Sequence, residues 1–335
     1  MQTKLYAVIL SALLLVPSAS FAGGFCCQMP TGVGTTGSGN TSLRLDYAVS
    51  HMERIISGSA EKDIDEVKSD PRFRKMNGVV PDVMDMERFT VSAAYSPMDR
   101  VTVNLAIPYV KNNMVMSMFM GGMWRTGTMD TVSGLGDVVL SGNYMIYRDR
   151  DVMPARAITV GAGVKMPTGE STVTSSGTKN RVHAHMQPGS GSWDPVFSAT
   201  YMNMINSDFL LTADANYQIG MPGSLNYEFG DTASLNTSLS YNALDWMNVS
   251  LGLNYFHAEQ NDDPDNKYNG NDSKRLTDYS GYTGEDSIWL SPGVQFLPFN
   301  NWTVDVKVQC PLYTHTPDIS QMTDYRVIAG ISAGW

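Results

Sequence analysis

The stretch ITVGAGVKM, residues 158–166, alternates apolar side chains with small or polar ones without a break. Successive side chains of a β-strand point to opposite faces, so this stretch has an apolar face that runs from Ile158 to Met166. The opposite face carries Thr159, two glycines and Lys165. In a soluble β-sandwich the apolar face would point into a shared core, whereas in an outer-membrane barrel it points at lipid and the polar face lines the lumen.

The same alternation recurs in about twelve segments of the chain, which predicts an all-β protein. The last of these segments ends on the aromatic residue Trp335. The segments expected to form strands are residues 43–49, 89–95, 101–107, 138–146, 158–166, 195–206, 209–217, 235–241, 249–255, 288–296, 302–308 and 327–335.

The connections between these segments alternate between short and long. The turns expected to be tight are residues 97–99, 148–154, 206–208, 244–246 and 300–301. The long polar connections expected between the other segments are residues 58–83, 111–133, 169–188 and 258–286. Short turns at one end and long loops at the other are typical of an outer-membrane barrel with an even number of strands. We therefore predict a transmembrane antiparallel up-and-down β-barrel of about 12 strands over residues 41–335.

The N-terminus resembles a secretory signal. A basic start that includes Lys4 precedes an apolar run over residues 6–16, and a small-x-small site ends at Ala22. The apolar run is too short to cross a bilayer as a helix. We expect residues 1–22 to be removed after Sec-type export, which leaves residues 23–40 as a short periplasmic or plug segment. A lipid anchor on Cys26 is the alternative, although the bulky Phe25 precedes it.

Composition agrees with export to the outer membrane. Charged residues make up 17% of the chain, whereas soluble domains carry about 25%. Without Lys4, 22 basic residues oppose 33 acidic ones, a net charge of −11. An acidic chain without a basic stripe is a poor nucleic-acid binder, so no nucleic-acid partner is expected. The three cysteines leave at least one unpaired.

Charged residues on the polar faces of the strands are candidates to line the lumen, because a cation that faces lipid at mid-membrane costs about 2 to 4 kcal/mol. They carry both signs, so they predict either a packed network of ion pairs or a polar constriction with little charge selectivity. The candidates are Arg44, Asp46, Arg88, Asp137, Lys165, Asp214, Asp305, Lys307 and Arg326.

Methionines gather in the expected loop at residues 111–133, close to Trp124. They are Met114, Met116, Met118, Met120 and Met123. Thioether side chains form adaptable apolar surfaces, so the loop is predicted to contact an apolar solute or to fold back as a plug. Two alternatives are binding of Cu(I), which prefers soft ligands, and a compositional bias without function.

Two further groups are candidates for metal binding. His183 and His185 would share one face of a strand and, with Met186, could form the edge of a metal site that lacks a further ligand. The acidic connection at residues 258–286 could bind calcium or divalent-bridged lipopolysaccharide, but its spacing differs from a calcium loop and a solvated acidic loop is the alternative. No resident cofactor is expected.

Catalysis is not expected. The sequence contains no Gly-x-Ser-x-Gly elbow, and its five histidines have no evident nucleophile partner. It also contains no Cys-x-x-Cys-His haem site.

Three stretches carry a family resemblance: GLGDVVL at residues 134–140, VKMPTG at residues 164–169 and GSGSWDP at residues 189–195. With them the chain resembles the outer-membrane barrel family of phenol-degradation (MetA pathway) transporters, which is related to the fatty-acid and aromatic-hydrocarbon channels. The resemblance implies an association with hydrocarbon uptake.

Together these features predict a monomeric outer-membrane channel for passive diffusion of a small apolar or aromatic solute. Its expected partners are the lipid bilayer, lipopolysaccharide, the solute, and the outer-membrane assembly machinery, which would read Trp335. The alternative is a barrel that acts as a scaffold for a periplasmic partner, such as a metal-handling factor or a multihaem cytochrome.

Overall fold

The computed structural model describes residues 39–151, 154–177, 180–299 and 301–335. The predicted signal peptide, most of the segment at residues 23–40, and Cys26 lie outside the described residues. In chain order the strands are β1 (Thr41–Gly58), β2 (Ala60–Lys62), β3 (Val79–Met98), β4 (Val101–Met120), β5 (Met123–Thr128), β6 (Val132–Leu135), β7 (Val138–Arg148), β8 (Arg156–Met166), β9 (Asp194–Met204), β10 (Phe209–Gln218), β11 (Thr232–Leu244), β12 (Met247–Ala258), β13 (Glu285–Phe299) and β14 (Trp302–Gly334).

Within the described part of the chain, helical segments are few and short. They are α2 (Ile64–Ser69) and the single-turn segments η1 (Ala184–Met186), η2 (Ser224–Asn226) and η3 (Ser280–Tyr282). Asp63 caps α2 by accepting a hydrogen bond from the backbone N–H of Asp65 at 2.8 Å. Across the described residues, no helix combines the length and apolar character needed to cross a membrane.

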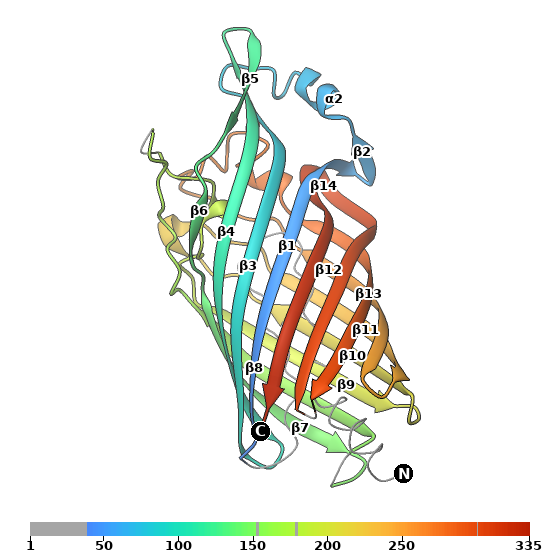
Figure 1. The fold of residues 1–335 in the computed structure, drawn as a ribbon. Coiled ribbons are helices and arrows are strands. Elements are labelled where there is room, and N and C mark those ends of the chain that lie inside the picture. The colour runs from blue at the N-terminus through green and yellow to red at the C-terminus, as the bar shows by residue number, and fades with distance from the viewer. Residues whose placement is uncertain (1–38, 152–153, 178–179, 300) are drawn as a thin grey trace.

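The sheet closes into a barrel of antiparallel neighbours. Eleven strands form its wall, in the order β14, β13, β12, β11, β10, β9, β8, β7, β4, β3, β1, and β1 pairs again with β14. Figure 1 shows this closure as the blue β1 lying beside the red β14. The three other strands are additions to this wall. Strand β2 pairs with β1, and strands β5 and β6 pair with β4.

The long strand β14 contributes two passes of the wall. Residues 302–315 pair with β13, and residues 316–334 pair with β1. Contacts between the two halves follow one antiparallel register, from Asn301 with Gly334 to Gln309 with Arg326. The eleven labelled strands therefore make twelve antiparallel passes, as a closed barrel with only antiparallel neighbours requires. The predicted all-β barrel of about 12 strands is confirmed.

The two ends of the barrel differ as the connections predict. One end, here called the short-turn end, holds the tight turns such as Asp99–Arg100 and Asp245–Trp246, together with Trp335. The opposite, long-loop end holds α2, η1, η2, η3 and the β4–β5 hairpin. Figure 1 shows β5 and α2 above the wall at this end.

The wall buries polar side chains and exposes apolar ones. On β12, Leu251 and Leu253 are 54% and 49% exposed, whereas Asn248 and Asn254 are 3% and 5% exposed. This pattern is the reverse of a soluble domain, where exposed patches of large apolar residues are small. A sandwich core is therefore excluded for these strands, and the apolar outer face fits a lipid environment.

The prediction of a long polar connection at residues 111–133 is wrong, because strands β4, β5 and β6 occupy most of it. The segment with Met114, Met116, Met118 and Met120 is the second half of β4 instead of a loop. It stays extended because it pairs with β3 on one side and with β5 on the other. Met123 and Trp124 start β5, directly after a Gly121–Gly122 turn whose positive φ angles suit glycine.

The outer face offers a test of membrane depth. Leu251 lies in the middle of β12, opposite Leu239 and Pro292. In lipid vesicles, Leu251→Lys should lower the free energy of unfolding by about 2 to 4 kcal/mol, because the cation would face the bilayer centre. Leu244→Lys, beside a short turn, is the matched control and should cost about 0 to 1 kcal/mol. Equal small losses in urea titrations of both variants would contradict a membrane-embedded wall.

Candidate functional site

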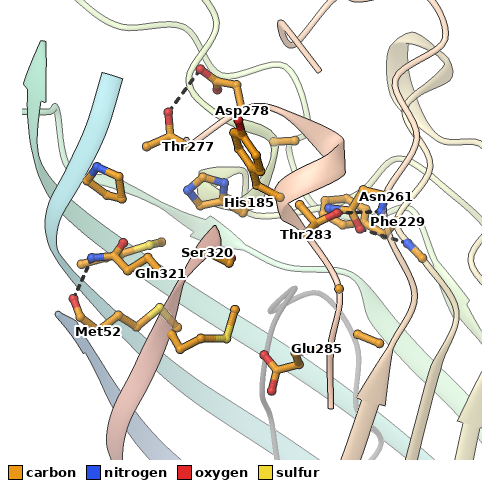
Figure 2. A pocket seen from close by; sticks show the side chains of 18 of the residues that line it. Met52, His185, Phe229, Asn261, Thr277, Asp278, Thr283, Glu285, Ser320 and Gln321 are labelled. Atoms are coloured by element: carbon orange, nitrogen blue, oxygen red, sulfur yellow. Dashed lines mark hydrogen bonds between the residues drawn. The ribbon is translucent and has the colours of Figure 1, made fainter. Parts of the chain in front are cut away.

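A cavity of about 140 Å³ lies inside the barrel at the long-loop end. Its walls come from β1, β3, β4 and the second half of β14, and from the long-loop ends of β10, β11, β12 and β13. Its roof comes from three loops that fold inward. In Figure 2 the His185 ring lies between Asp278 above and Met52 with Gln321 below. Both apolar and polar side chains thus border the same space.

Methionines form one wall of this cavity. Met52 on β1 is directly opposite Met84 on β3, and Met84 is directly opposite Met114 on β4. All three are buried, at 8%, 2% and 2% exposed, and Met86 and Met186 pack against them. The Asn112 amide donates a hydrogen bond to the Met186 carbonyl at 3.1 Å and so ties η1 to this wall.

Aromatic residues form part of the opposite side. Tyr227 contacts the rings of Phe229 and Tyr268 edge to face, with centroids 5.0 and 5.2 Å apart. The Tyr268 hydroxyl donates to the Ser171 carbonyl at 2.6 Å, and the Asn261 amide donates to the Tyr227 hydroxyl at 3.0 Å. These bonds satisfy the polar ends of the rings and leave their apolar faces toward the interior.

The predicted histidine pair lies in the roof, on η1 and the residue before it, and not on a strand. His183 contacts the carboxylate of Asp278, which also accepts a hydrogen bond from Arg275 Nε at 2.5 Å. Burial alone would raise the pKa of Asp278, but His183 and Arg275 outweigh burial and hold it at about 2. The His185 ring stacks on that of His183 at 5.5 Å. Burial, and to a lesser degree His183, lowers the pKa of His185 to about 3, so this imidazole is neutral.

The acidic connection between β12 and β13 is an ordered part of the roof. Asp263 is fully buried, and its carboxylate accepts hydrogen bonds from the backbone N–H groups of Tyr268 and Gly270, both at 2.9 Å. Asp265 and Asp272 pair with neighbouring lysines. Among the described residues, no group of three or more His, Cys, Asp or Glu is arranged to hold a metal ion.

Below the cavity, buried polar side chains fill the barrel. Lys165 on β8 contacts the carboxylate of Asp194, lies 3.7 Å from that of Asp137, and donates a hydrogen bond to Ser190 at 2.7 Å. The Ser190 hydroxyl in turn donates to Asp137 at 2.7 Å. Lys165, Asp137 and Asp194 are at most 1% exposed. We call these four residues the lysine knot.

The lysine knot explains the three stretches that carry the family resemblance. Asp137 belongs to the first stretch, Lys165 to the second, and Ser190 with Asp194 to the third. The backbones of the second and third stretches touch: a Cβ at Gly169 would lie 2.8 Å from the Cα of Gly189. Only glycine permits this approach, which places the Ser190 N–H 2.8 Å from the Asp137 carboxylate.

The other predicted lumen residues form two more groups inside the barrel. Arg44 makes paired hydrogen bonds with Asp305, at 2.8 and 3.0 Å, and also binds Asp46. Asp214 and Lys307 line a second, smaller cavity of about 20 Å³.

Nearer the methionine wall, Arg326 donates to Ser50 Oγ at 2.7 Å, and its guanidinium lies 5.6 Å from the Trp289 ring centroid. Arg88 is buried, at 4% exposed. Seven of the nine candidates are thus buried, and Asp46 and Lys307 are partly buried.

Sequence reasoning missed much of the cavity. Met52, Met84 and Met86 carried a usable signal, because they continue the inward faces of strands that also bear Ser50 and Arg88. No signal in the sequence indicated the aromatic residues of the cavity, because their loops fold inward only in the tertiary structure. These residues are Tyr227, Phe229, Tyr268 and Tyr282.

The lysine knot predicts a large loss of stability on neutralising its cation. Lys165→Met should lower the free energy of unfolding in detergent micelles by about 3 to 5 kcal/mol, because two carboxylates would remain buried without their cation. Removing a carboxylate as well, in Lys165→Met/Asp194→Asn, should recover part of the loss.

The control is Lys267→Met, which breaks the exposed Lys267–Asp265 pair of 2.7 Å and should cost about 1 kcal/mol or less. If Lys165→Met cost no more than this control, the lysine knot would contribute little to stability.

The neutral His185 predicts that the roof loosens in acid. The folded-state pKa of about 3 lies below the ordinary value, which is about 6.5, so the opened state binds more protons between these two values. The free energy of roof opening should fall as pH drops below about 6.5, by at most about 1.4 kcal/mol per pH unit.

Hydrogen exchange of residues 180–188, corrected for intrinsic rates, should therefore speed up between pH 7 and pH 4.5. His185→Phe keeps a ring on His183 without a titrating group, and it should remove most of this change. An unaltered pH response in that variant would contradict the assignment of the effect to His185.

Comparison with known proteins agrees with this architecture. No curated protein matches the chain in sequence. The outer membrane channel COG4313 from Pseudomonas putida F1 is 12% identical, with a TM-score of 0.60 over 92% of this chain and 100% of that chain, which shows a shared fold. The toluene transporters TodX of P. putida and TbuX of Ralstonia pickettii are 8% and 12% identical, with TM-scores of 0.44 and 0.41. These alignments cover 93% and 89% of this chain, and 96% and 90% of those chains.

A sequence profile of the family described as "Putative MetA-pathway of phenol degradation" matches residues 90–321. The match spans more than half of the 335 residues and contains the lysine knot and most of the cavity. The chain therefore belongs to the family of the MetA pathway of phenol degradation.

Proposed function

We propose that the protein is an outer-membrane channel that passes a small apolar or aromatic solute by way of the methionine-walled cavity. The observation that carries the proposal is a cavity with an apolar wall and an aromatic side, enclosed in a barrel whose outer face is apolar. An engineered apolar cavity of about 150 Å³ binds benzene. The cavity of about 140 Å³ has a comparable size.

The packed interior supports a selective passage over an open pore. The lysine knot and the Arg44 group occupy the barrel below the cavity, and they carry both charge signs. Ions would have to cross these pairs, so we expect low ion conductance without marked charge selectivity. A solute would pass after small side-chain movements, because thioether side chains change shape at little cost.

Several expectations remain part of this proposal. The apolar wall supports residence in the outer membrane, with contacts to the bilayer and lipopolysaccharide, after Sec-type export. The pairing of Trp335 with Thr41, through two backbone hydrogen bonds of 2.8 and 2.9 Å, supports a role for the last strand in barrel closure. Recognition of Trp335 by the assembly machinery and a monomeric state stay predictions. The comparisons bring no support to the scaffold alternative.

Filling the cavity tests the channel. Met84→Trp would place a larger side chain in the cavity wall and narrow the passage, so uptake of radiolabelled toluene by Gram-negative cells that express the protein should fall by about tenfold. Leu251→Trp is the matched control, because Leu251 is 54% exposed on the outer face and its replacement leaves the cavity unchanged.

Both variants should show the wild-type amount of heat-modifiable barrel in isolated outer membranes. Two outcomes would argue against a solute path through this cavity. Uptake with the wild-type protein could be no greater than uptake by cells without the protein, or Leu251→Trp could reduce uptake as much as Met84→Trp does.

A further inference from the structure

The methionine wall has a geometry that apolar packing does not require. Met52, Met84 and Met114 occupy one level of three adjacent strands and face inward. Directly opposed residues of antiparallel strands have Cβ atoms about 4.5 to 5.5 Å apart. Three flexible side chains at this spacing can bring their sulfur atoms to a single point.

Three further side chains that could act as ligands border the same place. Met186 is fully buried against the wall from η1, and Met86 packs beside it from the same face of β3. His185 lines the cavity, and its imidazole has no hydrogen-bond partner among the described residues.

We propose that this wall, formed by Met52, Met84 and Met114 with His185, binds one soft monovalent cation of the Cu(I) class. Thioethers and neutral imidazole are the ligands that Cu(I) accepts, whereas calcium and magnesium require carboxylate or carbonyl oxygens. The nearby carboxylate of Asp278 is already held by His183 and Arg275. The ligand set is therefore soft and neutral.

An entry path continues from the wall. Met116, Met118 and Met120 follow Met114 at alternate positions of β4, so they share its face. Met123 is directly opposite Met120 across the β4–β5 turn. Met120 and Met123 are 40% and 56% exposed, so the thioether series reaches solvent at the tip of the hairpin. The proposal concerns metal binding and does not depend on the proposed channel function.

Silver(I), a redox-stable substitute for Cu(I), tests the site in detergent-solubilised full-length protein. Cys26, Cys27 and Cys310 are replaced by serine in every sample, because thiolates bind silver more tightly than thioethers do. Calorimetry in chloride-free buffer should show about one Ag⁺ per chain. Met52→Leu/Met84→Leu/Met114→Leu keeps an apolar wall without sulfur and should weaken binding by about tenfold or more.

The matched control is Met145→Leu/Met202→Leu. These two methionines are buried at 6% and 4% exposed in a separate cluster, and neither lies directly opposite another methionine. Binding in this control should equal that of the cysteine-free parent. The proposal is overturned if the triple variant keeps the parent affinity, or if the control loses binding to the same extent.

A measurement on the cysteine-free parent covers the case of a triple variant that does not fold. X-ray absorption at the copper edge of the Cu(I)-loaded protein should show sulfur neighbours and one nitrogen neighbour, and His185→Gln should remove the nitrogen. A shell of oxygen ligands only would overturn the proposal. Toluene uptake without added metal is a separate readout, so failure of the channel and failure of the metal site are distinguishable.

Discussion

The pairing of β1 with β14 is the constraint on which the rest of the molecule depends. In lipid, a backbone N–H or C=O without a partner costs several kcal/mol, so a sheet can span a bilayer only if it has no edge. The register from Ser42 with Gly334 to Gly58 with Thr316 removes the edge over the whole height of the wall. Once the sheet is closed, its outer face contacts lipid and its inner face encloses the lumen. The alternation along each strand then places apolar residues on the outer face and polar residues on the inner face.

The polar inner faces of the strands bury charged side chains, and these side chains are stabilised by pairing with opposite charges. Buried charges are costly unless opposite charges and hydrogen bonds surround them. Lys165, with Asp137, Asp194 and Ser190, shows how the requirement is met, since three distant stretches of chain contribute to one cluster. The contact between Gly169 and Gly189 brings the loop before β9 down into the barrel. The charged network thereby also fixes the position of the roof.

The roof and the methionine wall give the long-loop end its distinct chemistry. Histidine and carboxylate groups in the roof are engaged with each other, as in the contact of His183 with Asp278. The wall beneath consists of unbranched thioethers, which adapt to apolar solutes and also coordinate soft cations. One cavity therefore supports two independent proposals, one for solute passage and one for metal binding.

The amino-acid sequence by itself determined most strands of the barrel wall, their faces and the parity of their connections, because a period of two and turn chemistry are local properties. The nine charges expected to face inward were chosen by the same period, and the structure buries seven of them and partly buries Asp46 and Lys307. Only the tertiary structure decided that Met114 to Met120 extend β4, since that segment becomes a strand by pairing with β3 and β5. It alone also placed Tyr227 and His185 over Met84, because the folding of loops into a lumen depends on contacts between residues far apart in the chain.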